Sequence, residues 1–565
     1  MAVFLQSPGV QVIEKDASAV TTGASSSVGG FVGAFQWGPV MTPMLISDES
    51  NLVSVFGKPD ADTFGAFFSA NNFLSYSSAL WVTRAATVNK NATADGTGLL
   101  IKNVYDYENG YANGQGAVGA FAARYPGTLG NSILVSVADS ATFATWAYKD
   151  QFQSAPGTSD FALSKGAVND ELHIIVIDAG GRFSASPGST LEKYSFVSKA
   201  SDAISFQGLS NYYANVIRNQ SQYVYWMKHA AGTTNWGSFA AATTFNLLVD
   251  TVAPGYDFTY TLAGGIDQNT ALNSELQLAW DLYKNVETYD ISLFFVGNAN
   301  TTLSKYVIDN IAETRKDAVV FVSLVDPTGG PVFSTSATAI VDATSFKSAM
   351  GNSTYTVIDS GYKYMYDKYN DKYRWIALNS DIAGLCAKVD ANQDAWFSPA
   401  GLTKGQIRGA IKLAWNPNQA QRDALYKLAI NPVVSFTGQG TLLYGDKTAT
   451  LKPSAFDRIN VRRLFLVLEK SISRSAKFQL FEQNDAITRL QFVSSVEPFL
   501  RDIQGRRGID AFKVICDASN NTAQVVSTNE FRGTILVRPL YSINFITLTF
   551  TATGPSVSFD TAAQV

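Results

Sequence analysis

The chain has 565 residues, of which 46% are hydrophobic and 16% are charged, and its formal net charge is −4. This composition excludes an intrinsically disordered protein and a generally basic nucleic-acid coat. The length predicts about two to four domains, each large enough to bury a core of its own.

The cysteines and the apolar runs bear on the compartment of the protein. Cys386 and Cys516 stand far apart and in no metal-ligand spacing, so two buried thiols are favoured over a disulfide. The first residues lack the basic start and long apolar core of a signal peptide, and no apolar run approaches membrane-spanning length. We therefore expect neither secretion nor membrane insertion.

Residues 1–25 predict an extended arm followed by a linker. A Pro-Gly pair breaks the chain just before a short stretch in which apolar and polar residues alternate. The residues of this candidate strand are Val10, Gln11, Val12 and Ile13. Residues 17–30 are dominated by Ser, Thr, Ala and Gly, which is typical of a linker. A strand separated from its domain in this way has an unpaired edge and can pair with the sheet of another molecule.

Residues 26–400 predict a globular region with a large insertion. Residues 91–260 are rich in Gly, Asn, Ser, Thr and aromatic residues and contain strand-like pieces such as Leu172–Asp178, which indicates a mostly β insertion. After it, predicted helices and strands alternate, which favours α/β packing. These elements are helix Leu276–Glu287, strand Ile291–Val296, helix Leu303–Arg315 and strand Ala318–Val325.

The stretch Ile459–Phe478 predicts an amphipathic helix, with an apolar stripe on one side and basic residues almost opposite. The basic residues, here called the basic ridge, are Arg463, Lys470, Arg474 and Lys477. By itself such a ridge is also the pattern of a solvated helix face. Between residues 457 and 513, however, eleven Lys and Arg residues stand against seven Asp and Glu residues. This local net charge of +4 leaves −8 for the remainder and suggests an acidic partner.

A second helix and two strands complete the C-terminal region. The helix lies within Phe481–Leu500, where Asn484 is placed as an N-cap. Its apolar face consists of Ile487, Leu490, Val493 and Val496. The strands are Gly533–Pro539 and Ile543–Thr551. After a Gly-Pro break, alternation with polar residues predicts a second free strand. Its apolar residues are Val557 and Phe559.

Several stretches imitate ligand-binding motifs without completing them. Residues 440–448 come close to a phosphate-binding loop, but Asp446 separates Lys447 from the second glycine. Residues 390–394 start like a calcium loop whose later Gly and Glu are missing. The glycines of residues 29–33 lack the preceding strand of a dinucleotide loop. Two histidines in unrelated sequence argue against a triad or a zinc site. We expect no enzyme, catalytic residue, cofactor or metal.

Ordered pieces of the chain resemble the contractile tail sheath proteins of phages and related injection machines. The pieces lie in residues 1–90, 123–137 and 261–552. They include FGKPD, ARYPGTLGNSILVSV, WIALNSDIAGLCAKVD, LAINPVVSFTGQGTLLYGDKT, INVRR and FEQND. Together with the patterns above, the resemblance implies an α+β multidomain fold. Its parts are an N-terminal arm and linker (1–25), a first part of an α/β sheath core (26–90), a mostly β insertion facing outward (91–260), a second part of the core (261–400), a C-terminal inner, polymerising domain (401–552) and a C-terminal arm (553–565).

The resemblance implies a structural subunit that polymerises with itself as stacked rings, six subunits per ring, around a tail tube. Contraction would drive the tube through the host envelope during genome delivery. The implied partners are other copies of the chain, the tail tube protein, and baseplate and tail terminator proteins, without direct contact with nucleic acid. The implied location is the virion, after assembly in the host cytoplasm.

Within this resemblance the candidate residues have expected roles. The two arms would add strands to the C-terminal sheets of neighbouring subunits. The basic ridge would face either the tube or a neighbouring sheath subunit. Two other functions stay open: the sheath of a phage-derived bacteriocin or secretion machine, and a glycan-binding or adhesive phage protein that uses the insertion as its binding module.

Overall fold

The computed structural model divides into two compact units. The larger unit comprises Ser25–Asn392 and Pro399–Asp457, and the smaller unit contains Gln393–Ser398 and the chain from Arg458 onward. The described residues are 26–86, 88–114, 117–230, 233–248, 258–267, 272–335 and 338–544. Both expected arms lie outside these residues.

A seven-stranded sheet forms the centre of the larger unit. Its order is β16-β12-β11-β10-β1-β3-β2, and all neighbouring strands are parallel except β2 and β3. The bounds are β1 Gly29–Gly33, β2 Met44–Ile46, β3 Leu80–Arg84, β10 Leu293–Phe295, β11 Val319–Ser323, β12 Thr356–Asp359 and β16 Ile430–Asn431. Most of these strands are fully buried runs of apolar and β-branched residues, as expected for a parallel sheet covered by helices on both faces.

Two consecutive residues of β10 show how helices cover both faces of this sheet. Phe295 stacks on Phe73 of α2 at 5.2 Å, whereas Phe294 contacts Trp280 of α6 at 5.8 Å. Successive side chains of a strand point to opposite faces, so α2 and α6 lie on opposite sides. The helices of this region are α1 Glu49–Phe56, α2 Phe64–Leu74, α6 Asn273–Asp281, α7 Thr301–Val307, the π-helical turn Ile308–Ala312, α8 Glu313–Arg315, α9 Ala339–Met350, α10 Asn379–Asn392 and α11 Gln419–Lys427.

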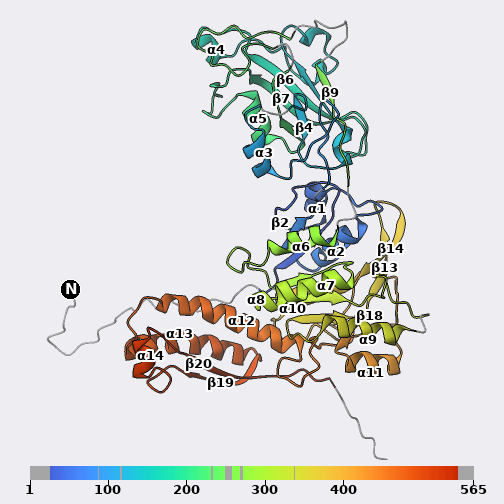
Figure 1. The fold of residues 1–565 in the computed structure, drawn as a ribbon, viewed down its shortest axis with the longest axis vertical. Helices are drawn as coiled ribbons and strands as arrows, with labels where there is room; N and C mark the ends of the chain where they lie inside the picture. Colours follow the sequence, from blue (N-terminus) through green and yellow to red (C-terminus); the bar gives the residue numbers. More distant parts are fainter. Residues whose placement is uncertain are drawn as a thin grey trace, which may run out of the picture. The chain divides into compact units, whose positions relative to one another are not determined.

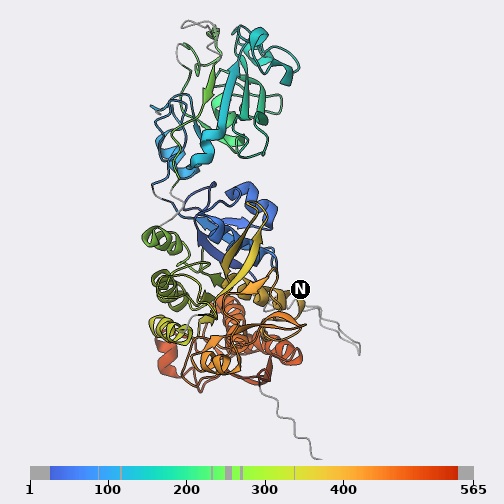
Figure 2. The same ribbon diagram turned by 90° about the vertical axis from the view of Figure 1, so that its right-hand side faces the viewer.

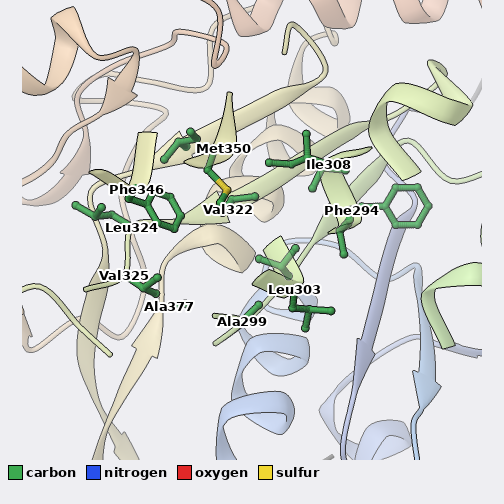
Figure 3. Close-up of a cluster of buried hydrophobic side chains, with 14 of the residues drawn as sticks. Phe294, Ala299, Leu303, Ile308, Val322, Leu324, Val325, Phe346, Met350 and Ala377 are labelled. Atoms are coloured by element: carbon green, nitrogen blue, oxygen red, sulfur yellow. The ribbon is translucent and has the colours of Figure 1, made fainter. Parts of the chain in front are cut away.

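The main hydrophobic core lies on the α6 side of the sheet. Figure 3 shows Val322 of β11 together with Phe346 and Met350 of α9, and all three side chains are at most 3% exposed. Close packing also explains a glycine of β1, because a Cβ on Gly30 would lie 2.5 Å from the ring of Phe294. The expected alternation of helices and strands between residues 276 and 325 is present.

Two smaller sheets complete this part of the larger unit. The antiparallel sheet β14-β13-β15 contains a long hairpin, and a second hairpin consists of β17 and β18. The bounds are β13 Tyr362–Asp367, β14 Lys372–Ala377, β15 Lys412–Leu413, β17 Val433–Phe436 and β18 Gly440–Leu443. Residues 401–457 were expected in the C-terminal domain, but they belong to the larger unit. The reason is pairing at long range, since β16 joins the central sheet beside β12. The other expected domain boundaries stay predictions.

The insertion is built on an antiparallel sheet of order β7-β6-β5-β9. Its strands lie side by side in both views (Figure 1, Figure 2). The sheet strands are β5 Ile133–Ala138, β6 Glu171–Asp178, β7 Ser189–Ser198 and β9 Thr259–Thr261, and a separate pair consists of β4 Phe121–Ala123 and β8 Val224–Trp226. The helices are α3 Val104–Gly110, α4 Asp160–Ser164 and α5 Tyr213–Gln220, with 3-10 turns at Thr128–Ser132, Phe143–Thr145 and Lys149–Gln151. The expected strand Leu172–Asp178 is part of β6.

The smaller unit packs two long helices against one hairpin. Figure 1 shows α12 and α13 side by side, with β19 and β20 next to them. The bounds are α12 Ile459–Ala476, the 3-10 turn Lys477–Gln479, α13 Ala486–Gly505, β19 Ile509–Ile515, α14 Ala523–Ser527 and β20 Thr534–Pro539. The α13 N-cap is Asp485, which accepts from the Thr488 N–H at 2.8 Å, and not Asn484 as expected.

The expected chemistry of the thiols is confirmed. Both Cys386, in the larger unit, and Cys516, in the smaller unit, are free and buried. Burial raises the pKa of the Cys516 thiol. A buried thiol with a raised pKa is a structural, poorly reactive group.

Candidate functional site

The hairpin of β19 and β20 has one buried and one open face. Its register runs from Ile509 opposite Pro539 to Ile515 opposite Thr534, with an irregularity after Ile509. The apolar side chains of one face belong to the core of the smaller unit. The other face is solvated and includes Leu536, which is 53% exposed.

The two edges of this hairpin are a candidate site for strand pairing. Among the described residues, β19 and β20 pair only with each other. An isolated two-stranded sheet is marginal in water, and an unpaired edge presents a row of N–H and C=O groups to another strand. The arrangement can therefore accept an extended segment on either side. The arm residues Val10, Gln11, Val12, Ile13, Val557 and Phe559 lie outside the described residues, so their pairing stays a prediction.

The four residues of the basic ridge do not share one environment. Arg474 and Lys477 are exposed, and Lys470 is partly buried. Arg463 is only 3% exposed, which corrects the expectation that it faces outward. The physical reason is that the first turns of α12 are buried almost all round, Arg462 and Arg463 included. A helical wheel identifies the apolar side of a helix but not how much of its circumference is covered.

An exposed apolar segment next to the basic ridge was missed at the sequence level. The connection between α12 and α13 and the start of α13 expose five large apolar side chains. They are Phe478 (72% exposed), Leu480 (62%), Phe481 (103%), Ile487 (66%) and Leu490 (65%), here called the apolar tip. Ile487 and Leu490 were expected on the apolar face of the second helix. Val493 and Val496, which were expected on the same face, do pack in the core of the smaller unit, together with Phe492 and Leu500.

Side-chain hydrogen bonds fix the chain within the apolar tip, between Phe481 and Ile487. The Asn484 side-chain amide donates to the Glu530 carbonyl at 2.7 Å, and Arg489 donates to the Asn484 side chain at 2.8 Å and to its carbonyl at 2.9 Å. Phe481 adopts a left-handed backbone conformation with φ of 71°. A bulky residue in that region is strained, and strain held by surrounding structure is a feature of functional surfaces. A large exposed apolar cluster indicates a contact with a partner.

The ligand-like motifs do not form sites in the structure. The first residues of the phosphate-loop imitation are strand β18, and Asp446 is 2% exposed. No group of His, Cys, Asp and Glu within the described residues is arranged to hold a metal ion. An open groove of about 680 Å³ follows α13, but its Arg501 and Arg506 pair with Glu497 and Asp502 on the same helix. Of the described helices, none combines the length and hydropathy needed to cross a membrane.

Known protein families match most of the second half of the chain. Residues 269–449 match the phage tail sheath protein central domain, and residues 451–553 match the phage tail sheath C-terminal domain. Similar proteins extend the match to the first half. The tail sheath protein of Vibrio phage KVP40 is 33% identical, with 98% of this chain and 99% of the relative covered. The tail sheath protein of Enterobacteria phage T4 is 31% identical at the same coverage.

Solved structures agree at the level of the fold. The sheath tail protein of Listeria innocua superposes with a TM-score of 0.54 at 12% identity, covering 93% of this chain and 97% of that one. The helical sheath of the anti-feeding prophage in its contracted state gives a TM-score of 0.51 at 11% identity, covering 97% and 100%. At these identities the likeness concerns the fold alone.

Proposed function

The chain belongs to the phage tail sheath protein family, and we propose that it polymerises into the contractile sleeve around a phage tail tube. Tail sheath proteins are virion components, which gives the location of this chain. The observation that carries the proposal is the β19–β20 hairpin, a small sheet whose two edges pair with no other strand of the described residues, in a family of tail sheath proteins. A phage tail is favoured over a bacteriocin or secretion sheath because the relatives at 31–33% identity are phage proteins.

The arms are proposed to link neighbouring copies. One copy would add Val10–Ile13, and another would add the segment around Val557 and Phe559, to the two edges of the same hairpin. Backbone hydrogen bonds would supply affinity, and the alternate apolar side chains would fix the register against the half-buried face. Linked copies can change their spacing without separating, which is what contraction of a sleeve requires.

Two features of the smaller unit are proposed to contact partners. Arg474 and Lys477 are exposed basic side chains, and the apolar tip begins at Phe478, immediately after Lys477. Exposed ion pairs are each worth about 0–1 kcal/mol, so the charges would orient the contact more than hold it. The apolar tip would supply most of the affinity through burial. The partner is the tail tube or a neighbouring sheath subunit.

The remaining expectations follow from family membership and are part of the same proposal. Six subunits would form each ring, rings would stack between a baseplate and a tail terminator, and contraction would drive the tube through the host envelope for genome delivery. Assembly would take place in the host cytoplasm. No nucleotide would be consumed, and the energy would be stored in the extended lattice.

Electron microscopy of the purified full-length protein tests this function. We expect long hollow cylinders, which are lost on deletion of residues 1–16 or 554–565. A point variant distinguishes loss of strand pairing from an effect of shortening the chain. Val12→Asp should prevent assembly. The matched control Gln11→Asp changes a residue on the opposite side of the predicted strand and should still assemble. Monodisperse particles at high concentration, unchanged when tube protein is added, would contradict the proposal.

A further inference from the structure

A continuous row of aromatic rings lies on the β13–β14 hairpin of the larger unit. The ring centroids are 5.3 Å apart for Tyr366 and Tyr373, 5.4 Å for Tyr373 and Tyr364, and 4.6 Å for Tyr364 and Trp375. Phe333 extends the row at 5.3 Å from Trp375. We call these five residues the aromatic row. The hairpin is the pair of strands labelled β13 and β14 in Figure 1.

Packing within the chain buries only part of the hairpin face that carries the aromatic row. At the base of the hairpin, Tyr362 and Ala377 lie on the same face and are buried in the main core. Toward the tip, the face emerges into solvent, where Tyr366 is 45% and Tyr373 53% exposed, and Phe333 is 40% exposed. The opposite face of the hairpin is covered, because β14 packs against α2. The aromatic row is therefore a sheet face without a covering layer among the described residues.

The outer edge of β14 is partly prepared for an extended backbone. In the order β14-β13-β15, β14 is an edge strand. The side-chain amide of Asn298 donates to the Trp375 carbonyl at 3.4 Å and accepts from the Ala377 N–H at 2.9 Å. These are the two bonds that one residue of a neighbouring strand would make. Beyond Asn298 the edge opens, at Tyr373, into a cleft of about 430 Å³ that is also lined by Phe64, Pro331 and Phe333.

The charges around the aromatic row select the chemistry of a partner. Lys412 lies 4.8 Å from the Tyr364 ring centroid and 5.7 Å from that of Trp375, so a cation already occupies these ring faces. Sugar stacking needs an open ring face, which disfavours a glycan there. Lys412 and Lys372 are exposed and form no ion pair with any described residue. Of the nearby acids, Asp367 pairs with Arg374, whereas Asp371 accepts, among the described residues, only from the Tyr366 hydroxyl and keeps its charge, so the two lysines leave a surplus of positive charge. An acidic partner matches this surface.

We propose that the aromatic row, the open edge of β14 and the two lysines dock an extended acidic segment of a neighbouring copy of this chain. The proposal rests on the proposed sheath function, because only a polymer presents a second copy at high local concentration. The contact would lie in the larger unit and would be separate from strand exchange at the β19–β20 hairpin. It would give each subunit a second contact with its neighbour, made by aromatic side chains and lysines and not by the N- and C-terminal arms.

The first test measures assembly of the full-length chain by sedimentation. The double variant Tyr366→Ser, Tyr373→Ser removes two exposed rings, and we expect the concentration needed for assembly to rise about tenfold or more. The matched control is Tyr105→Ser, which changes a tyrosine that is 74% exposed on α3 and should leave assembly unchanged. Thermal unfolding of the variants should match that of the parent. Assembly of the double variant at the parental concentration would overturn the inference.

The second test identifies the occupant directly. A photo-crosslinking phenylalanine analogue replaces Tyr373, and the assembled protein is irradiated and mapped by mass spectrometry. We expect covalent dimers joined to an acidic segment of the other copy. Crosslinks confined to the same chain, or to no protein at all, would overturn the inference. If the parent chain never assembles, the proposed function itself fails, so the two failures are distinguishable.

Discussion

Lys199 and Asp139 form an ion pair in the insertion, with Nζ 2.9 Å from Oδ2 and both side chains fully buried. The carboxylate also accepts from the Leu248 N–H at 2.7 Å, and Lys199 donates to the carbonyls of Asn169 and Asn246. Burial lowers the pKa of Lys199, and Asp139 opposes this effect. The pair therefore ties together segments of the insertion that are distant in sequence.

We expect Lys199→Ala to destabilise the insertion by about 3–5 kcal/mol, because it leaves the Asp139 charge buried without its partner. The comparison is Arg218→Ala, which breaks the 2.8 Å pair with Glu108, where the two side chains are 38% and 44% exposed. That change should cost about 0–1 kcal/mol. Limited proteolysis and chemical denaturation measure both. Equal losses of unfolding free energy in the two variants would show that burial of the ion pair does not determine the loss.

Asp359, at the end of β12, predicts a pH dependence of stability. It is 1% exposed, and burial raises its pKa well above the ordinary value, with a further contribution from Asp381. Its carboxyl accepts from the Ser323 hydroxyl at 2.8 Å and from the Gly361 N–H at 2.9 Å. The folded state thus binds a proton that the unfolded state releases. The corresponding stability is fully present below the unfolded pKa and is lost as pH rises through the folded pKa.

Asp359→Asn tests this dependence, because Asn imitates the protonated acid. Relative to the parent, the variant should gain stability as pH rises above the unfolded pKa of Asp359, by about 1.4 kcal/mol for each unit of the pKa difference. Denaturation at several pH values measures the difference. A difference between the two proteins that is independent of pH would contradict a raised pKa.

Two positions of the basic ridge should respond differently to charge reversal. Arg463 is 3% exposed, so Arg463→Glu should destabilise the smaller unit by more than about 3 kcal/mol. Arg474 is exposed, so Arg474→Glu should change stability by less than about 0.5 kcal/mol while weakening assembly or tube binding. Unfolding measurements and a tube co-sedimentation assay separate these effects. Normal tube binding and assembly by Arg474→Glu would exclude this residue from the contact.

At the apolar tip, we expect one substitution to stabilise the folded chain and at the same time to weaken assembly. Phe481→Gly removes a fully exposed ring and relaxes a backbone at φ of 71°, so it should stabilise the smaller unit by about 0.5–1 kcal/mol. Assembly should nevertheless weaken. Phe478→Ser is the control, since it removes an exposed ring without a gain from the backbone. Unchanged assembly in both variants would assign the apolar tip no role in the polymer.

The amino-acid sequence determined the features that depend on local pattern. A helix over Ile459–Phe478 was predicted from apolar spacing, and the structure has α12 at Ile459–Ala476. The run Leu172–Asp178 was predicted as a strand and is part of β6. The ordered pieces that resemble tail sheath proteins identified the family, because such a resemblance depends on the order of the residues and not on how they pack.

Tertiary structure decided what is covered and what pairs at long range. Arg463 has the same charge as Arg474, but neighbouring residues bury it. A helical wheel does not show such burial. Residues 401–457 join the larger unit because β16 pairs with β12 across some seventy residues of chain, as Asn431 opposite Asp359 shows. Ile487 and Leu490 of the apolar tip were predicted on the apolar face of a helix, but they are 66% and 65% exposed. Only the packed chain leaves them in solvent, because exposure depends on every other element and not on the residue itself.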